Sequence, residues 1–95
     1  MDISTITVTI AEDAISQEIG GETVILDLNG EQYFGLDSTG TRIWQLLEQH
    51  GNLQRLYDTM LTEFEVDAGQ LKSDLTQLIE QLCDAELITM SEAET

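Results

Sequence analysis

The spacing of apolar residues changes once along this chain, close to Asp37, and this change limits the possible folds more than any other feature. Before it, apolar residues alternate with polar ones or form short β-branched runs. After it, they recur at intervals of three and four positions as far as Leu82. The 95 residues include no proline and no repeat or low-complexity linker, so one domain is expected. Strands followed by helices, rather than alternating with them, predict an α+β fold.

The clearest strand signal is a hairpin centred on Asn29-Gly30. Asn-Gly between two apolar segments favours a two-residue turn, in which both residues take a positive φ. The flanking segments are residues 23–28, which are dense in β-branched side chains, and residues 31–36. They are predicted to pair as antiparallel strands.

Residues 6–10 are expected to complete a three-stranded antiparallel sheet, because their sequence ITVTI alternates apolar and polar side chains. Gly20-Gly21 is a further turn signal, and residues 14–19 before it have only weak strand character. The predicted order is therefore three strands followed by three helices.

The first two helices are predicted on either side of Gly51. The first covers residues 39–50 and ends at Gly51, because glycine is typical of the position just after a helix. Asn52 then caps the second helix by accepting a hydrogen bond from a free backbone N–H group. Apolar residues on the face of the second helix are Leu53, Leu56, Tyr57, Met60, Leu61 and Phe64. Of the aromatic side chains in this half, the core is expected to take Trp44, Tyr57 and Phe64.

The third helix is predicted to begin at residues 67–70, where Asp-Ala-Gly-Gln resembles a capping box with aspartate in place of serine or threonine. On a helical wheel, Asp74 lies at the polar margin of its apolar face. The domain is expected to cover residues 1–90, and residues 91–95, the end of the polar segment TMSEAET, are expected to fray. The apolar residues of this helix are Leu71, Leu75, Leu78, Ile79 and Leu82.

Charge is the strongest feature of the composition. The chain has 19 acidic and 3 basic residues, and its formal net charge is −16. Arg42, Arg55 and Lys72 are scattered, whereas nucleic-acid binding requires several cations to neutralise phosphates. The charge therefore argues against nucleic acid and against an anionic membrane surface as partners. A basic partner would be attracted by this field, although acidic surfaces also simply keep small proteins soluble.

No pattern of residues points to an enzyme, a metal or a cofactor. His50 and Cys83 are the only histidine and the only cysteine, and neither belongs to a cluster with metal-ligand spacing. No Gly-rich phosphate loop is present, and no pair of acids stands out from the acidic background. The N-terminal residues lack the features of a signal peptide and a single cysteine fits a reducing compartment, so a cytoplasmic protein is expected.

Ser38 has two interpretations. In a small acidic protein, an Asp-Ser pair at the start of a helix is similar to the attachment site of an acyl carrier protein. A carrier protein is almost wholly helical, however, whereas strands are predicted before Ser38. The simpler interpretation is that Asp37, Ser38 or Thr39 caps the first helix by accepting its free backbone N–H groups.

The strings GETVILDL, QYFGLD and RIWQLL, together with Gly40, resemble the PqqD-like proteins, the recognition elements of RiPPs (ribosomally synthesised and post-translationally modified peptides). The most specific part is YFGL-D-x-x-G-x-x-IW-x-LL, and the resemblance covers roughly residues 5–88. It implies a winged-helix-like fold without catalytic activity. The implied function is to capture the leader segment of a precursor peptide and present it to a maturation enzyme or leader peptidase. YFGLD is closer to the lasso-peptide and unclassified members than to the quinone type.

The resemblance also implies where a leader would bind. In such proteins the leader adds as a strand beside the third strand, and its apolar side chains enter a groove against the third helix. Neighbouring strand residues face opposite sides, so either Tyr33 or Phe34 faces this groove. Two other functions stay open: an acyl-carrier-like protein modified at Ser38, and a protein-interaction module without a peptide substrate. The expected peptide-binding residues are Glu31, Gln32, Tyr33, Phe34, Gly35, Leu36, Leu71, Asp74, Leu75 and Leu78.

Overall fold

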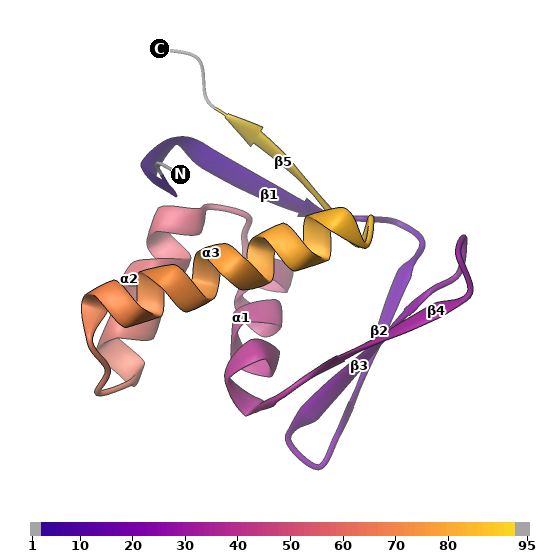
Figure 1. Ribbon diagram of the computed structural model, residues 1–95, viewed down its shortest axis with the longest axis horizontal. Coiled ribbons are helices and arrows are strands. Elements are labelled where there is room, and N and C mark those ends of the chain that lie inside the picture. Colours follow the sequence, from indigo (N-terminus) through magenta and orange to yellow (C-terminus); the bar gives the residue numbers. More distant parts are fainter. Residues whose placement is uncertain (1–2, 93–95) are drawn as a thin grey trace.

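The computed structural model describes residues 3–92 and has an α+β fold, with three α-helices and two antiparallel sheets in this part of the chain (Figure 1). The predicted fold class, the three-stranded sheet and the three helices are therefore confirmed. In chain order, the elements are the 3-10 helix η1 (Ile3–Thr5), β1 (Ile6–Ile10), β2 (Ala14–Ile19), β3 (Glu22–Asp27), β4 (Gln32–Leu36), α1 (Ser38–Gln49), α2 (Leu53–Glu63), α3 (Ala68–Asp84) and β5 (Ile88–Glu92).

The strands of the three-stranded sheet differ from those expected. Its order is β2-β3-β4, so the weakly patterned residues 14–19 supply the outer strand in place of residues 6–10. The apolar pattern that predicts a strand is weak in β2, because Ile15 and Ile19 face solvent and the strand contributes no fully buried side chain. Strand β1 instead pairs with β5, from the opposite end of the described chain.

Strand β5 ends with two residues, Ser91 and Glu92, that were expected to fray. Ile88 pairs with Ile10 and Met90 pairs with Val8, and the pairing continues through Ser91 and Glu92. Ile88 is fully buried, which fixes this end of the strand in the core. The expected fraying therefore does not hold for Ser91 and Glu92, and residues 93–95 lie outside the described part.

The β3–β4 hairpin is confirmed, but its turn is not a two-residue Asn-Gly turn. The last paired residues are Asp27 and Gln32, so four residues form the loop, and among them only Glu31 has a positive φ, of 54°. The side chain of Asp27 shapes this loop by accepting a hydrogen bond from the backbone N–H of Asn29 at 3.0 Å. A longer loop with one left-handed residue replaces the predicted turn.

The tight turn lies instead at Gly20-Gly21, between β2 and β3. Ile19 pairs directly with Glu22, and the two glycines between them have φ values of 60° and 86°. Two consecutive positive φ angles are what a two-residue hairpin turn needs, and glycine adopts them without a steric penalty.

The three helices begin in the same way, with a side-chain oxygen that accepts a hydrogen bond from a backbone N–H three residues later. The distances are 2.8 Å from Gly40 to Asp37, 2.9 Å from Arg55 to Asn52 and 3.3 Å from Gln70 to Asp67. The predicted caps at Asn52 and Asp67 are confirmed. The side-chain amide of Gln70 donates a hydrogen bond to Asp74, one turn further along α3, at 2.8 Å.

Gly51 is needed for a different reason than the one predicted. Helix α1 ends at an extended His50, with φ of −162°, and Gly51 is not among the described residues with a positive φ. Its carbonyl accepts a hydrogen bond from the N–H of Val8 in β1, at 2.8 Å. A Cβ atom on residue 51 would collide with the carbonyl oxygen of Val8, so this close contact requires glycine.

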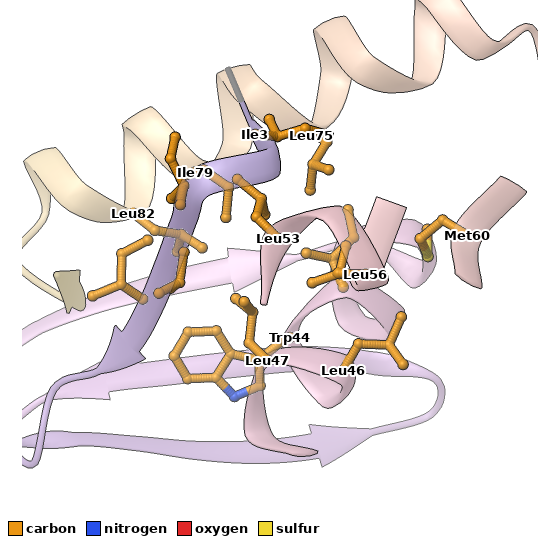
Figure 2. Packing of buried hydrophobic residues seen from close by; sticks show 14 of the residues in the cluster. Ile3, Trp44, Leu46, Leu47, Leu53, Leu56, Met60, Leu75, Ile79 and Leu82 are labelled. Carbon is orange, nitrogen blue, oxygen red and sulfur yellow. The ribbon is translucent and has the colours of Figure 1, made fainter. Parts of the chain in front are cut away.

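The core lies where the three helices meet each other and the two sheets (Figure 2). Trp44 is buried as predicted, and it belongs to the same buried cluster as the inner faces of α2 and α3. Tyr57 and Phe64 are only partly buried at the edge of this cluster. Burying each large apolar side chain contributes roughly 1.5–3 kcal/mol, so the helical half provides most of the driving force for folding. The residues with 0 % exposure are Ile25, Leu53, Leu56, Met60, Leu75, Ile79 and Leu82.

An ion pair and a short polar chain fix α1 to its neighbours. Arg42 donates to both carboxylate oxygens of Glu63 in α2, at 2.7 and 2.6 Å. The hydrogen bond from Arg42 is the main reason that the pKa of Glu63 is lowered. Gln45 accepts from Arg42 at 3.3 Å and donates to Glu18 of β2 at 3.1 Å. Helix α1 is thereby joined to α2 and to the three-stranded sheet.

The turn assignment can be tested with Gly21→Val. A β-branched residue at φ of 86° is strained, so the free energy of unfolding should fall by about 1–2 kcal/mol. Urea denaturation followed by circular dichroism measures it. Gly35→Val is the control, because residue 35 is not among the described residues with a positive φ and a Cβ atom there would meet nothing within 4 Å. Equal losses in the two variants would contradict the assignment.

Candidate functional site

Strand β4 forms one edge of the three-stranded sheet, as predicted for this segment. Its other side pairs with β3, and no other strand of residues 3–92 pairs with its free edge. An edge strand presents unpaired N–H and C=O groups, and such a row is a template for another extended chain. The free edge of β4 is therefore the first component of a candidate site.

An open groove of about 480 Å³ runs beside this edge. Three elements form it: the second half of β4, the first turns of α1 and the middle of α3. Its floor is apolar and its margin is polar, which is typical of sites that hold a ligand by burial and orient it by a few polar contacts. The lining residues are Phe34, Gly35, Leu36, Asp37, Thr39, Gly40, Ile43, Asp74, Leu78 and Gln81.

The alternation along β4 decides which aromatic residue lines the groove. Phe34 pairs with Ile25, which is fully buried, so Phe34 shares the face of the sheet that packs toward the helices. Tyr33 pairs with Leu26 on the opposite face and is 74 % exposed. The groove therefore takes Phe34, and Tyr33 points away from it.

Helix α3 contributes a stripe of three residues, Asp74, Leu78 and Gln81, which follow one another at intervals of four and three. Leu71 and Leu75 were also expected at the site. They are 5 % and 0 % exposed, and they belong to the core rather than to the groove lining.

Five of the ten expected residues meet at the groove. Glu31 lies in the turn before β4 and Gln32 at its first position, and neither lines the groove. Those that the fold brings together are Phe34, Gly35, Leu36, Asp74 and Leu78.

The contribution of α1 was not anticipated. Strand β4 passes into α1 through the cap Asp37, so the first turn of the helix lies directly beside the end of the strand. A Cβ atom on Gly40 would lie 3.2 Å from the Cβ of Leu36, so glycine allows this close approach. Thr39 and Ile43 follow on the same side. The longer motif YFGL-D-x-x-G-x-x-IW-x-LL, which includes Gly40 and Ile43, was the available signal for this part of the groove.

The groove is acidic at its margin. Asp37 and Asp74 supply two carboxylates, and none of the lining residues is a lysine or an arginine. Each carboxylate already accepts one hydrogen bond, from Gly40 or from Gln70, but a carboxylate can accept several. The site therefore suits a ligand with apolar side chains and a neighbouring positive charge.

Ser38 is not the cap of α1. The cap is Asp37, and Ser38 is the first helical residue, with an exposed side chain. This position follows a strand, so the helical surroundings of a carrier-protein serine are absent here.

Within residues 3–92, no three histidine, cysteine or acidic side chains come together in a way that could hold a metal ion. None of the helices in that part of the chain has both the length and the apolar character that a membrane span needs.

Comparison with known proteins decides the family. The family model described as coenzyme PQQ synthesis protein D (PqqD) matches residues 22–88. This chain belongs to the PqqD family. The matched region contains β3, β4 and the three helices, and hence every groove-lining residue. The family that the sequence resembles is thus confirmed.

A solved structure extends the PqqD match to nearly the whole chain. The chain described as "TbiB1 in Complex with the TbiA(beta) Leader Peptide" is 34 % identical, with a TM-score of 0.82 over 90 % of this chain and 99 % of that one. A search of the curated proteins found no match. The solved relative is a protein determined with a leader peptide bound.

The role of Asp37 as the cap predicts different effects at adjacent positions. Asp37→Ala should lower the free energy of unfolding by about 1 kcal/mol, because the N–H of Gly40 loses its partner. Ser38→Ala should change it by less than about 0.5 kcal/mol, as exposed substitutions usually do. Thermal and urea denaturation of both variants measure this. A larger loss from Ser38→Ala than from Asp37→Ala would show that Asp37 is not the residue that caps the helix.

Proposed function

We propose that this protein binds the leader segment of a ribosomally synthesised precursor peptide at β4 and presents it, in the cytoplasm, to a maturation enzyme or leader peptidase. It would act by binding alone, without a catalytic step, in a lasso-peptide or related pathway. The observation that carries the proposal is the free edge of β4 beside a groove against α3. The solved relative with a bound leader peptide supports it.

Strand addition at β4 would provide orientation and part of the affinity. Each backbone hydrogen bond to an added strand contributes about 0.5–1.5 kcal/mol net, and β4 has only five residues. The remaining affinity and the selectivity must come from side chains that enter the groove. Alternate residues of the added strand would face Phe34, Leu36 and Leu78, where apolar side chains are buried most effectively.

The charge of the groove sets the second requirement on the leader. Asp37 and Asp74 form an acidic margin on a chain with a net charge of −16, so a lysine or arginine beside the apolar residues would be attracted.

We also propose that the helices and the β3–β4 hairpin form the winged-helix-like arrangement that the family resemblance implies. The packing of α1 against β3 and β4 supports this.

The genes around this one provide an independent observation. A recognition protein should be encoded next to a short precursor and a maturation enzyme, whereas a general interaction module need not be. For an acyl carrier, incubation with a phosphopantetheinyl transferase should add mass at Ser38. We expect no added mass, because the serine starts a helix that follows a strand.

The groove can be tested with Asp74→Lys and the leader encoded beside this gene. Asp74 is exposed, so the melting temperature should change little. Leader affinity should fall by about 1–3 kcal/mol, because a charge that attracts the leader is reversed. The loss should shrink as salt rises, since exposed charges are screened. Isothermal titration at two salt concentrations measures both effects.

Glu80→Lys is the matched control for Asp74→Lys. It makes the same charge change at another exposed position of the same helix, but Glu80 does not line the groove beside β4. Leader affinity should change much less in this variant. Equal losses would show that only overall charge matters, and unchanged binding in both would show that the leader does not pass along this margin of α3.

A further inference from the structure

The outer face of the three-stranded sheet, which points away from the helices, carries an apolar surface that no other described element covers. Ile15 of β2, Leu26 of β3 and Tyr33 of β4 form one row across the sheet, because Leu26 pairs with both of the others. Val24 lies on the same face, two residues from Leu26 on β3. Ile19 also lies there, four residues from Ile15 on β2. These five residues are called the outer apolar face.

The orientation of this face follows from the residues between its members. Glu18, which lies next to Ile19, points to the opposite side and accepts a hydrogen bond from Gln45 of α1. Ile25, which lies between Val24 and Leu26, is fully buried against the helices. The helices therefore cover only the inner face of this sheet, and the outer face is open to solvent.

The exposure of the outer apolar face is large for residues of this kind. Ile15 is 51 % exposed, Ile19 is 61 % exposed and Tyr33 is 74 % exposed. Single apolar residues are common on protein surfaces, but apolar residues grouped across three strands, with Gln17 and Glu22 among them on the same face, indicate an interaction site.

The charge around this face selects the kind of partner. Residues 1–41, which include all three strands of this sheet, contain no lysine or arginine. Exposed acidic residues lie near it in the turns and on β3, among them Glu12, Glu22 and Glu31. A second copy of this chain would bring like charges together, whereas a protein with basic residues around an apolar centre would be complementary.

The outer apolar face is continuous with the edge where the leader is proposed to bind. A strand added to β4 extends the same sheet, so every second side chain of the leader would point outward, next to Tyr33 and Gly35. Gly35 has no side chain there, and a Cβ atom in its place would meet nothing within 4 Å. The outward leader side chains would therefore lie directly beside the outer apolar face.

We propose that the outer apolar face, together with the outward side chains of the bound leader, is the docking surface for the maturation enzyme, through an enzyme surface with an apolar centre and a lysine- or arginine-rich rim. This inference rests on the proposed function. Groove and outer face then have separate roles: the inner side of β4 holds the leader, and the outer side of the sheet holds the enzyme.

The size of the face makes docking depend on the leader. A stable protein interface usually takes about 20–30 residues from each partner, and the outward residues of three strands with five or six residues each are fewer than this. A leader strand would add its own outward side chains to this surface, so we expect the enzyme to bind the leader complex more tightly than the free protein. We expect the leader to raise enzyme affinity at least about fivefold. Because the two binding steps are linked, the enzyme must raise leader affinity by the same factor.

The test is the double variant Ile15→Thr/Ile19→Thr, which keeps β-branched residues on β2 but removes much of the apolar surface. The probes are the leader and the maturation enzyme encoded beside this gene. Leader affinity should stay unchanged, because neither residue lines the groove. Enzyme affinity for the leader complex should fall roughly tenfold or more. Val66→Thr, at an apolar residue that is 48 % exposed in the loop between α2 and α3, is the matched control and should retain enzyme binding.

Each result decides between the two levels of the proposal. The docking surface is supported if the double variant loses enzyme affinity and Val66→Thr does not. The factor by which the leader raises enzyme affinity should then equal the factor by which the enzyme raises leader affinity. If the leader binds but the enzyme does not bind, or binds the double variant and the wild type equally, the docking surface is overturned and the leader-binding function stands. If the leader does not bind, both are overturned. Self-association of the wild type in sedimentation velocity that the double variant abolishes would assign the face to a second copy instead.

Discussion

The packing of α3 into the core is the interaction on which the rest of the structure depends. Leu75, Ile79 and Leu82 are completely buried, and they hold the helix at a fixed distance from β4. The groove exists because the next stripe of the same helix, which contains Asp74 and Leu78, is left beside the open sheet edge. Stability and the proposed ligand binding therefore use neighbouring faces of one helix, and a change at Leu75 would affect both.

The three-stranded sheet divides its two faces in a similar way. Its inner face is closed by α1, through buried Ile25 and the contact between Glu18 and Gln45. Its outer face stays open and apolar, and its β4 edge stays unpaired. A sheet with one closed face, one open face and one free edge could bind partners at the open face and at the edge while its closed face stays part of the core. The chain belongs to the PqqD family, and its solved relative was determined with a leader peptide.

Charge acts over the whole molecule rather than at one residue. The acidic margin of the groove and the strands without lysine or arginine both belong to a chain with a net charge of −16. Its three basic side chains lie in the helical half, and Arg42 among them is already paired with Glu63. This field would disfavour self-association and would attract basic partners to the groove and to the sheet.

The sequence by itself determined the features that depend on residues close together in the chain. These are the change from strands to helices near Asp37, the caps at Asn52 and Asp67, and the β3–β4 hairpin, because caps and short turns involve residues within about four positions of one another. Only the tertiary structure decided that β1 pairs with β5, that Phe34 rather than Tyr33 lines the groove, and that α1 forms part of it. Those features depend on which face of each element the assembled core buries, and that choice is made by contacts between segments far apart in sequence.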